Sequence, residues 1–326
     1  VPHPSGLPSE CIVIETDGKD EWKELKPVAN YEDMDPSALR NVIRDAGIVG
    51  LGGAGFPSFI KLNPGPDNVV ETLILNGAEC EPYITCDAML MQEHPRRIID
   101  GLLVMKHALR AKHCIIAIED NKKVAHTMLV NALHEHESEF IDIVQIPTLY
   151  PTGGEKQLVR VLTGKEIPSN GLPIDIGVVC HNVATAAAIC ETIEAGKPLI
   201  SRVMTLTGEA LESPCNLEIL VGTSFAHLLE ACGWHEEQTD EVLMGGPMMG
   251  FSISSLDTPV IKTTNCILAR PKNQPHRQPA MPCIRCGQCA NVCPAQLLPQ
   301  QLYWYSRAKD FDKAQDYNLF DCIECG

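Results

Sequence analysis

Apolar residues recur along the middle of the chain with two periods, one typical of buried strands and the other of amphipathic helices. Between residues 69 and 196, short apolar runs are each followed by a longer segment with apolar residues every three or four positions. Strands are expected at 69–77, 114–120, 141–147 and 175–182, and helices at 96–110, 123–136, 154–164 and 183–196. This alternation predicts an α/β domain with a largely parallel sheet.

The residues before this alternating region predict one helix and one isolated strand. Asp35 is a plausible N-cap, Pro36 suits the first helical position, and the residues that follow have helical apolar spacing. Cys11–Glu15 alternates as a strand does, but no candidate partner strand precedes it. We therefore expect residues 1–34 to be the tail of a preceding domain with a linker, and the α/β domain to cover 35–197.

The hydrophobic pattern changes after Lys197 and predicts a second, smaller domain. Residues 201–224 read as strand, turn and strand, 225–233 as one short helix, and 241–253 as a strand with glycine turns. A small α+β domain over 198–269 fits this order of elements.

The last part of the chain, 270–326, begins with a polar segment that contains several prolines, a composition typical of a linker over 270–282. Beyond it lie six cysteines in two groups. We expect a linker followed by a separate cysteine-rich domain.

Length, charge and composition exclude several classes of protein. With 326 residues, 44% of them hydrophobic, the chain can bury a core in each of several domains. The net charge is −16 and no basic face is apparent, which argues against nucleic acid as a partner. No apolar run approaches the roughly 18 residues of a membrane span, and no signal peptide is apparent. The cysteines at metal-ligand spacing then indicate a reducing compartment, the cytoplasm.

The most specific motif is "CIRCGQCANVCP", which places Cys283, Cys286, Cys289 and Cys293 in the pattern CxxCxxCxxxCP. Three thiolates at this spacing can hold one face of a [4Fe–4S] cluster, while the fourth ligates a second cluster. A structural zinc site more often uses CxxC pairs separated by a longer loop, so zinc is the weaker alternative.

A second, shorter motif, "DCIECG", contributes Cys322 and Cys325 to the same scheme. We expect Cys283, Cys286 and Cys289 to bind one cluster, and Cys293 to share the second cluster with Cys322 and Cys325. The fourth ligand of each cluster is then expected beyond Gly326, so the clusters are expected to be incomplete when only these six cysteines are present.

A glycine-rich stretch, "GLGGAGFPSFIK", contains Gly50, Gly52 and Gly55 in the spacing GxGxxG. A dinucleotide fingerprint needs a strand before the glycines and a helix after them, and here a predicted helix precedes them. The sequence therefore argues against that fingerprint. An anion site remains, since glycines let backbone N–H groups approach a phosphate and Lys61 lies nearby; a purely structural turn is the alternative.

Polar residues also follow several of the predicted strands at the edge where ligands bind in open α/β sheets. They are Asn76, Glu79 and Glu81 in "NGAECEP", Gly153, Gly154, Glu155 and Lys156 in "PTGGEKQ", and Asn182 and Thr185 in "HNVATA". Each alone is more often a cap or a turn. Together they predict a site for a large polar cofactor.

The four segments "GLGGAGFPSFIK", "NGAECEP", "PTGGEKQL" and "HNVATA" resemble, in this order, the flavin-binding segments of the NADH-oxidising flavoprotein subunit of respiratory complex I. When the two cysteine motifs are considered as well, the chain is more similar to the C subunit of Rnf-type electron transport complexes than to the complex I subunit. These complexes are ion-translocating ferredoxin:NAD+ oxidoreductases, and their SoxR-reducing counterparts have a similar C subunit. The resemblance covers nearly the whole chain.

This resemblance implies a Rossmann-like FMN-binding domain, a β-grasp domain of the SLBB type and a two-cluster ferredoxin-like domain, preceded by the remnant of a barrel-sandwich domain. It implies FMN, two [4Fe–4S] clusters and NAD(H) as substrate. Partners would be the other subunits of the membrane complex and a ferredoxin-type iron–sulfur subunit, with the chain bound peripherally on the cytoplasmic side of the bacterial inner membrane.

The resemblance also implies roles for individual residues. The residues near the FMN phosphate and ribityl chain would be Gly52, Gly53, Gly55 and Lys61. Those near the flavin ring would be Asn76, Glu79, Gly154, Glu155, Asn182 and Thr185. Glu81 and Phe56 would line the nicotinamide nucleotide pocket.

No catalytic residue of the chain itself is expected, because hydride transfer between nicotinamide and flavin is chemistry of the cofactors. Two alternative functions stay open on the sequence alone. One is a flavoprotein subunit of the complex I type, with one cluster. The other is a non-enzymatic relay and docking subunit with ferredoxin clusters.

Overall fold

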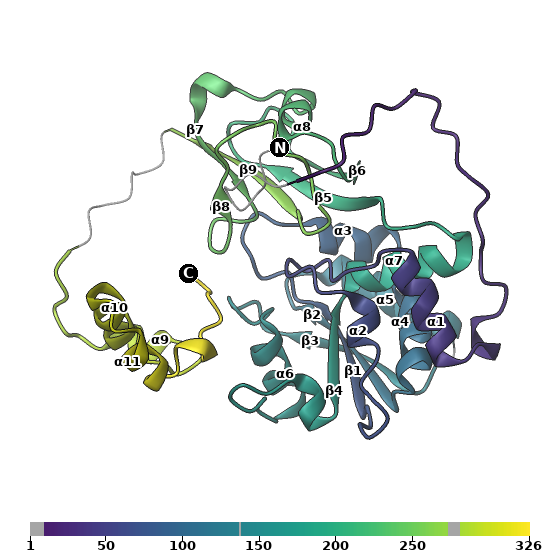
Figure 1. The fold of residues 1–326 in the computed structure, drawn as a ribbon, viewed down its shortest axis with the longest axis horizontal. Coiled ribbons are helices and arrows are strands. Elements are labelled where there is room, and N and C mark those ends of the chain that lie inside the picture. Colours follow the sequence, from purple (N-terminus) through teal and green to yellow (C-terminus); the bar gives the residue numbers. More distant parts are fainter. Residues whose placement is uncertain (1–9, 137, 273–280) are drawn as a thin grey trace.

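The computed structural model describes residues 10–136, 138–272 and 281–326, and it contains a parallel sheet, a mixed sheet and a small helical unit (Figure 1). The strands of the parallel sheet are β1 (Thr72–Gly77), β2 (His113–Glu119), β3 (Ile141–Ile146) and β4 (Val178–Asn182). They lie in the order β3-β2-β1-β4, and every neighbouring pair is parallel. The predicted α/β domain with a parallel sheet is confirmed.

Helices cover both faces of this sheet. They are α1 (Pro36–Asp45), α2 (Ser58–Lys61), α3 (Cys86–Glu93), α4 (Pro95–Leu109), α5 (Lys123–His136), α6 (Glu155–Thr163) and α7 (Val183–Ala195). The larger core lies between the sheet and α1, α4, α5 and α7, and a smaller one lies under α6 on the opposite face (Figure 1).

Helices α4 and α7 pack backbone against backbone. A Cβ atom added at Gly101 of α4 would lie 1.9 Å from the carbonyl oxygen of Ala186 in α7, closer than any real contact. Only glycine at position 101 allows the two helices to approach this closely.

Capping explains where several helices begin. The Asp35 carboxylate accepts a hydrogen bond of 2.8 Å from the Ser37 N–H, and Pro36 takes the first helical position, as the sequence predicts. The sequence pattern did not predict α2, which has only four residues, or α3. In α3 the buried residues are Cys86, Ala88, Leu90 and Met91, which do not form a single apolar stripe.

The second sheet has five strands: β5 (Ser201–Thr207), β6 (Cys215–Leu220), β7 (Thr239–Met244), β8 (Phe251–Ser252) and β9 (Cys266–Pro271). Their order is β6-β5-β9-β7-β8, and β5 and β9 are parallel while the other pairs are antiparallel. Helix α8 (Phe225–Ala231) buries Phe225 and Leu229 against one face. This arrangement is a β-grasp fold.

The other face of the β-grasp sheet contacts the α/β domain. Leu243, Cys266 and Leu268 form a small buried cluster with Ile84 and Cys86, which lie at the start of α3. The two domains therefore share a dry interface next to α3.

The remaining elements are short. Three short helices follow, α9 (Gln288–Val292), α10 (Pro299–Ala308) and α11 (Phe311–Asp316). Helices α10 and α11 lie between the two cysteine motifs and pack around a small core of Leu297, Leu302 and Ala314. The 3₁₀ turns are η1 (Tyr31–Asp33), η2 (Pro173–Ile176), η3 (Glu236–Gln238) and η4 (Leu319–Asp321). Strand β9 continues two residues past the expected start of the linker, and residues 273–280 of that linker lie outside the described residues.

The strand expected at Cys11–Glu15 does not form. Ile12, Val13 and Ile14 are between 76% and 90% exposed, and no strand is assigned there. Alternation alone does not make a strand, because the backbone N–H and C=O groups also need a partner strand. The prediction of a strand is wrong, and the assignment of 1–34 to the end of a preceding domain stays a prediction.

In the described part of the chain, we find no helix that combines the length and the apolar character needed to span a bilayer.

Candidate functional site

The candidate site lies where the order of strands reverses. The chain moves from β1 outward through β2 and β3 and then returns to place β4 on the other side of β1. In open α/β sheets the carboxyl ends of the strands at such a point flank a ligand-binding crevice. Asn76 of β1 and Asn182 of β4 are direct neighbours in the register, so the structure brings these two predicted residues together.

The glycine-rich loop lies beside this point. The Gly50 N–H donates to the Phe56 carbonyl at 2.8 Å, and a bridge between Val49 and Pro57 closes the loop. Helix α1 precedes it, which agrees with the argument against a dinucleotide fingerprint. The buried Thr185 hydroxyl accepts a hydrogen bond of 3.0 Å from the Leu51 N–H and so fixes the loop to the start of α7.

Three glycines of the loop have distinct reasons to be glycine. Gly53 has φ +120°, and a Cβ atom added there would meet no atom within 4 Å, so one side of this residue is open. Gly55 has φ +65° and lies so close to Thr263 that an added Cβ would be 2.6 Å from its methyl group. At Gly52 an added Cβ would lie 3.3 Å from the Cβ of Asn182, so the loop passes directly over the end of β4.

The first turn of α6 meets the same edge of the sheet. The Asn76 side-chain amide donates to the Gly153 carbonyl at 2.8 Å, and Gly154 is the N-cap of α6. Lys61 of α2 forms an ion pair of 2.5 Å with Glu155. The structure therefore brings the predicted residues of "GLGGAGFPSFIK", "NGAECEP" and "PTGGEKQ" together.

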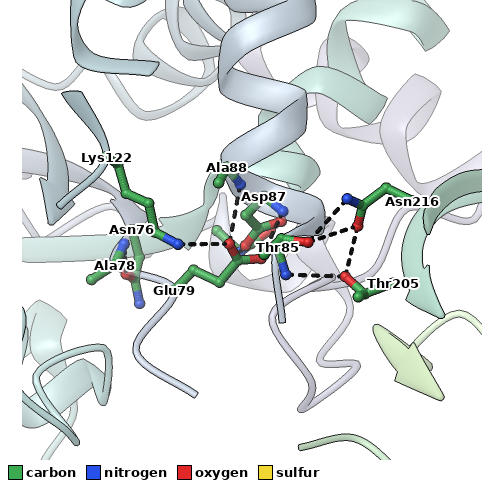
Figure 2. Close-up of polar contacts among 10 residues, drawn as sticks. Asn76, Ala78, Glu79, Thr85, Asp87, Ala88, Lys122, Thr205 and Asn216 are labelled. Carbon is green, nitrogen blue, oxygen red and sulfur yellow. Dashed lines mark hydrogen bonds and ion pairs between the residues drawn. The ribbon is translucent and has the colours of Figure 1, made fainter. Parts of the chain in front are cut away.

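Glu79 is the centre of a buried polar cluster (Figure 2). Its carboxylate accepts hydrogen bonds from the N–H groups of Asp87 (2.8 Å) and Ala88 (3.2 Å) at the start of α3, and Lys122 lies 3.6 Å away. The Glu79 side chain is only 4% exposed. Burial, and secondarily the negative charge of Asp87, raise the pKa of Glu79 to about 7, against the opposing effects of the hydrogen bonds and Lys122.

Asp87 connects this cluster to β4. The Asn182 side-chain amide donates to the Asp87 carboxylate at 2.6 Å, while the Asn182 side-chain oxygen caps α7 by accepting from the Ala184 N–H at 2.8 Å. Burial raises the pKa of Asp87 as well. Both asparagines at the end of the sheet therefore also serve to hold the local backbone.

The start of α3 is also fixed to the β-grasp domain (Figure 2). The Thr85 N–H donates to the Thr205 hydroxyl at 3.1 Å, and the Asn216 amide donates to the Thr85 hydroxyl at 2.9 Å. Thr205 and Asn216 lie on β5 and β6, so the two domains hold the buried cluster between them.

The two residues expected at the nicotinamide nucleotide lie in different surroundings. The Glu81 carboxylate accepts from the N–H groups of Met248 (2.6 Å) and Met249 (3.1 Å) in the turn between β7 and β8. An added Cβ at Gly246 would lie 2.1 Å from Glu81, so that turn closely covers the glutamate. Phe56 is 50% exposed at the glycine-rich loop. Their role at a nucleotide stays a prediction.

The two CxxC loops have the same local geometry. In the first, the Arg285 N–H donates to the Cys283 sulfur at 3.4 Å, and in the second the Glu324 N–H donates to the Cys322 sulfur at 3.4 Å. Arg285 and Glu324 both have positive φ, +59° and +53°. N–H groups directed at cysteine sulfurs are a feature of iron–sulfur ligation, so both loops fit a [4Fe–4S] cluster.

The other four expected cluster ligands differ in their hydrogen bonds and exposure. Cys293 accepts a hydrogen bond of 3.4 Å from the Leu297 N–H, while Cys286 and Cys289 are exposed on the same small domain and Cys325 is partly buried. Of the nine cysteines outside the two motifs, six are buried, Cys80 and Cys215 are partly buried, and Cys11 is exposed.

The second CxxC loop contacts the loop before α6 and the first turn of that helix. The Tyr150 hydroxyl donates to the Cys325 carbonyl, and Lys156 forms an ion pair of 3.2 Å with Asp321. The Ser169 hydroxyl donates to the other oxygen of Asp321 at 2.7 Å. The cysteine domain therefore docks on the segment that Asn76 also holds.

Some polar atoms beside the site lack a partner within the described residues. They are the Ser58 hydroxyl on α2, the His181 Nε2 at the end of β4 and the Gln157 side-chain oxygen in the first turn of α6. Burial, with a contribution from Lys61, lowers the pKa of His181 well below its usual value, so its ring is neutral. Buried groups without partners, together with the open side of Gly53, fit a polar cofactor such as FMN at this edge.

Sequence reasoning missed several residues of the site, namely Ser58, Asp87, Lys122, His181 and Arg202. Arg202 lies on β5 and donates to the carbonyl of Leu51 in the glycine-rich loop. Lys122 and His181 could have been found, because both lie at or just after the carboxyl end of a predicted strand. Asp87 and Arg202 do not lie at the carboxyl end of a predicted strand, so nothing in the sequence singled them out.

Three family models match successive parts of the chain. The Nuo51 FMN-binding domain matches residues 43–191, the SLBB domain matches 203–252, and the 4Fe-4S dicluster domain matches 276–326. These ranges follow the parallel sheet, the β-grasp sheet and the cysteine-rich segment in that order.

Solved structures show the same fold. A crystal structure of an NAD+-reducing [NiFe]-hydrogenase in the air-oxidized state aligns with a TM-score of 0.63 over 72% of this chain and 46% of that chain, at 22% identity. The H2-reduced state of such an enzyme aligns with a TM-score of 0.62 over 75% of this chain and 49% of that chain, at 20% identity.

Curated relatives are much closer in sequence. The C subunit of the ion-translocating oxidoreductase complex of Pseudomonas aeruginosa is 49% identical over 98% of this chain and 41% of its own length. The protein of the same name from Serratia proteamaculans is 51% identical over 98% of this chain and 45% of its own length. The chain thus spans about half the length of the curated relatives it matches.

The fold and the site define a modular protein that combines an FMN-binding α/β domain, an SLBB-type β-grasp domain and a [4Fe–4S] dicluster domain. Within that class, the chain belongs to the family of C subunits of ion-translocating oxidoreductase complexes, the Rnf type that the sequence motifs indicated.

Proposed function

We propose that the protein is the peripheral electron-transfer subunit of a membrane-bound, ion-translocating ferredoxin:NAD+ oxidoreductase. The observation that carries the proposal is the docking of the second CxxC loop, through Cys325 and Asp321, on the segment 150–156 that borders the candidate flavin site. Cofactors that exchange electrons must lie near one another, and this contact brings their expected binding segments together.

The residues of the α/β domain would bind and orient FMN. Lys61 would meet the phosphate, and the N–H groups of Gly52, Gly53 and Gly55 would surround it. The residues expected beside the ring are Asn76, Glu79, Gly154, Glu155, Asn182 and Thr185. Bound FMN would supply exchange of a hydride with NAD(H) and of single electrons with the clusters. The protein's task is to hold the cofactor and exclude water.

The ion pair between Lys61 and Glu155 has a consequence for binding. Phosphate and the Glu155 carboxylate would compete for the same ammonium group, so the lysine must turn towards the phosphate or share its charge. We propose Glu81 and Phe56 for the nicotinamide nucleotide, which would require the nucleotide to lie near the turn between β7 and β8.

The dicluster domain would hold two [4Fe–4S] clusters. We propose Cys283, Cys286 and Cys289 for one, and Cys293, Cys322 and Cys325 for the other. The matching N–H to sulfur contacts of the two CxxC loops support equivalent roles for both motifs.

We also propose that the partners are the other subunits of the complex, including a ferredoxin-type iron–sulfur subunit, and that the chain lies on the cytoplasmic side of the inner membrane. The names of the relatives, which describe a subunit of an ion-translocating complex, support the other subunits of such a complex as partners. The proposed domain boundaries are 1–34, 35–197, 198–269 and 270–326.

The test is anaerobic reduction of the protein after reconstitution with FMN, iron and sulfide. NADH is expected to bleach the visible absorption of the flavin to the extent that dithionite does. A flavin that binds but does not respond to NADH would contradict the proposal and would favour a relay subunit. Iron and sulfide analysis of the intact subunit separates two clusters, about eight of each, from the single cluster of a complex I-type subunit, about four.

A further inference from the structure

The β-grasp domain contacts the glycine-rich loop and the residues just before it at three points spaced four residues apart. The Lys262 ammonium donates to the Gly47 carbonyl at 2.6 Å, and Arg202 donates to the Leu51 carbonyl at 3.1 Å. The third contact is the close approach of Gly55 to Thr263. The β-grasp domain thus holds residues 47–55 of the α/β domain, from just after α1 through the glycines of the loop.

Arg202 is the central contact. It lies on β5, is only 4% exposed, and its guanidinium donates to the carbonyls of Leu51 and Lys262, the latter at 2.6 Å. A planar guanidinium with fixed donor directions suits two carbonyls that come from different segments. The negative charge of Asp87 lies close enough to lower the cost of burying this cation.

The Leu51 peptide is held on both sides. Its N–H donates to Thr185 of the α/β domain, and its carbonyl accepts from Arg202 of the β-grasp domain. With both polar groups fixed, the peptides on either side of Leu51 are held, so the glycines that follow start from a fixed position. A loop that is ordered before its ligand arrives loses less conformational entropy on binding and binds more tightly.

We propose that Arg202 and Lys262 of the β-grasp domain are positioning residues for the FMN-binding loop, so that this domain acts as a brace of the cofactor site. The proposal rests on the proposed function of the glycine-rich loop as the FMN phosphate site. Neither residue is expected to touch the cofactor; both act through the loop backbone.

Two other cations of the β-grasp domain make their contacts within that domain and provide controls. Lys272 donates to the Glu237 carbonyl at 2.8 Å within its own domain. Arg270 forms an ion pair of 2.6 Å with Glu241, also within the domain. Loss of Lys272 would remove a lysine–carbonyl bond of the same kind as that of Lys262, and a change at Arg270 would alter an arginine of the same domain; neither contact reaches the glycine-rich loop.

The first experiment compares Lys262→Met with Lys272→Met in the intact protein by titration with FMN, followed through quenching of flavin fluorescence. Lys262→Met is expected to raise the Kd for FMN about tenfold, and Lys272→Met less than about twofold. Hydrogen exchange of the unliganded protein is expected to become faster at the amides of residues 47–56 in Lys262→Met only.

The second experiment uses Arg202→Lys, which keeps the positive charge but loses the planar guanidinium that donates to two carbonyls at once. Arg270→Lys is its control. A higher Kd for FMN and faster exchange at residues 47–56 are expected for Arg202→Lys alone. If Arg202→Lys does not fold, the Lys262→Met variant alone tests the proposal. The Lys262 side chain is partly exposed, and its loss leaves the buried network around Arg202 intact.

The outcomes separate this proposal from the proposed function. One outcome is that the unaltered protein binds FMN and that the Lys262 and Lys272 variants have the same Kd and the same exchange rates. The proposed positioning role of the β-grasp domain is then wrong, and the proposed FMN site is unaffected. The opposite outcome is that the unaltered protein does not bind FMN but hydrogen exchange at residues 47–56 is faster in the Lys262 variant than in the Lys272 variant. The β-grasp domain then does position the loop, and the proposed function of the loop is wrong.

Discussion

The substitution Glu79→Gln tests the electrostatics of the buried cluster beside the site. The Glu79 carboxylate is almost fully enclosed, faces the negative charge of Asp87, and has Lys122 as its counter-ion at 3.6 Å. These surroundings raise its pKa from 4.5 to about 7. Glutamine has nearly the same shape but does not titrate, so the substitution removes the pH dependence that Glu79 itself contributes without opening a cavity.

The sign of the effect is the reverse of that for a carboxylate in a strong ion pair. The folded state holds the proton of Glu79 more tightly than the unfolded state does, so stability falls as the pH rises from 4.5 towards 7. At about 1.4 kcal/mol per pH unit, the group costs the folded state up to about 3 kcal/mol once the pH exceeds 7. This loss is absent in Glu79→Gln.

The assay is chemical denaturation without FMN at several values between about pH 5 and pH 8.5, followed by circular dichroism. The free energy of unfolding of the unaltered protein is expected to fall relative to Glu79→Gln by about 2–3 kcal/mol across this range. The control is Glu71→Gln, which removes an exposed glutamate paired with Lys112 at 2.8 Å and should follow the unaltered protein. Parallel curves for the unaltered protein and Glu79→Gln would refute the reasoning.

Three further predictions address the cofactor segments. Lys61→Ala is expected to raise the Kd for FMN about tenfold in the fluorescence titration, because a phosphate partner is lost; an unchanged Kd would place the phosphate elsewhere. Asp321→Asn should weaken the docking of the second CxxC loop and speed hydrogen exchange at residues 319–326 several-fold, with the Kd for FMN unchanged; equal exchange rates would mean that the contact contributes nothing to docking. Cys293→Ser is expected to lower the iron content of the reconstituted protein by roughly half, whereas Cys232→Ser, at a buried cysteine outside the motifs, should not; equal iron contents would reject the ligand assignment.

The sequence predicted the parts of the fold that depend on local pattern. The strands of the parallel sheet follow from short apolar runs, and the longer helices that cover it follow from apolar residues at helical spacing. The cap at Asp35 follows from its own chemistry and the proline after it. The meeting of Asn76 and Asn182 was also predictable, because the carboxyl ends of parallel strands share one edge of the sheet.

What could not be predicted depends on contacts between distant segments. Arg202 reads as an ordinary strand residue, and its bond to the Leu51 carbonyl spans 151 positions of sequence. The burial of Glu79 depends on α3, whose buried residues do not follow a helical stripe. At Cys11–Glu15 the opposite error occurred, because a good local pattern has no partner strand in the described residues.

The contact of Gly101 with Ala186 carries a consequence for how the protein tolerates change. Thr185, the residue that anchors the glycine-rich loop, directly precedes Ala186, so the position of the loop depends on how closely the backbones of α4 and α7 approach each other. A single methyl group added at position 101, distant in sequence from every cofactor segment, would push against the anchor itself. Variation at this inconspicuous glycine should therefore impair cofactor binding as surely as variation in the loop, and a genetic screen for flavin-deficient variants should recover it.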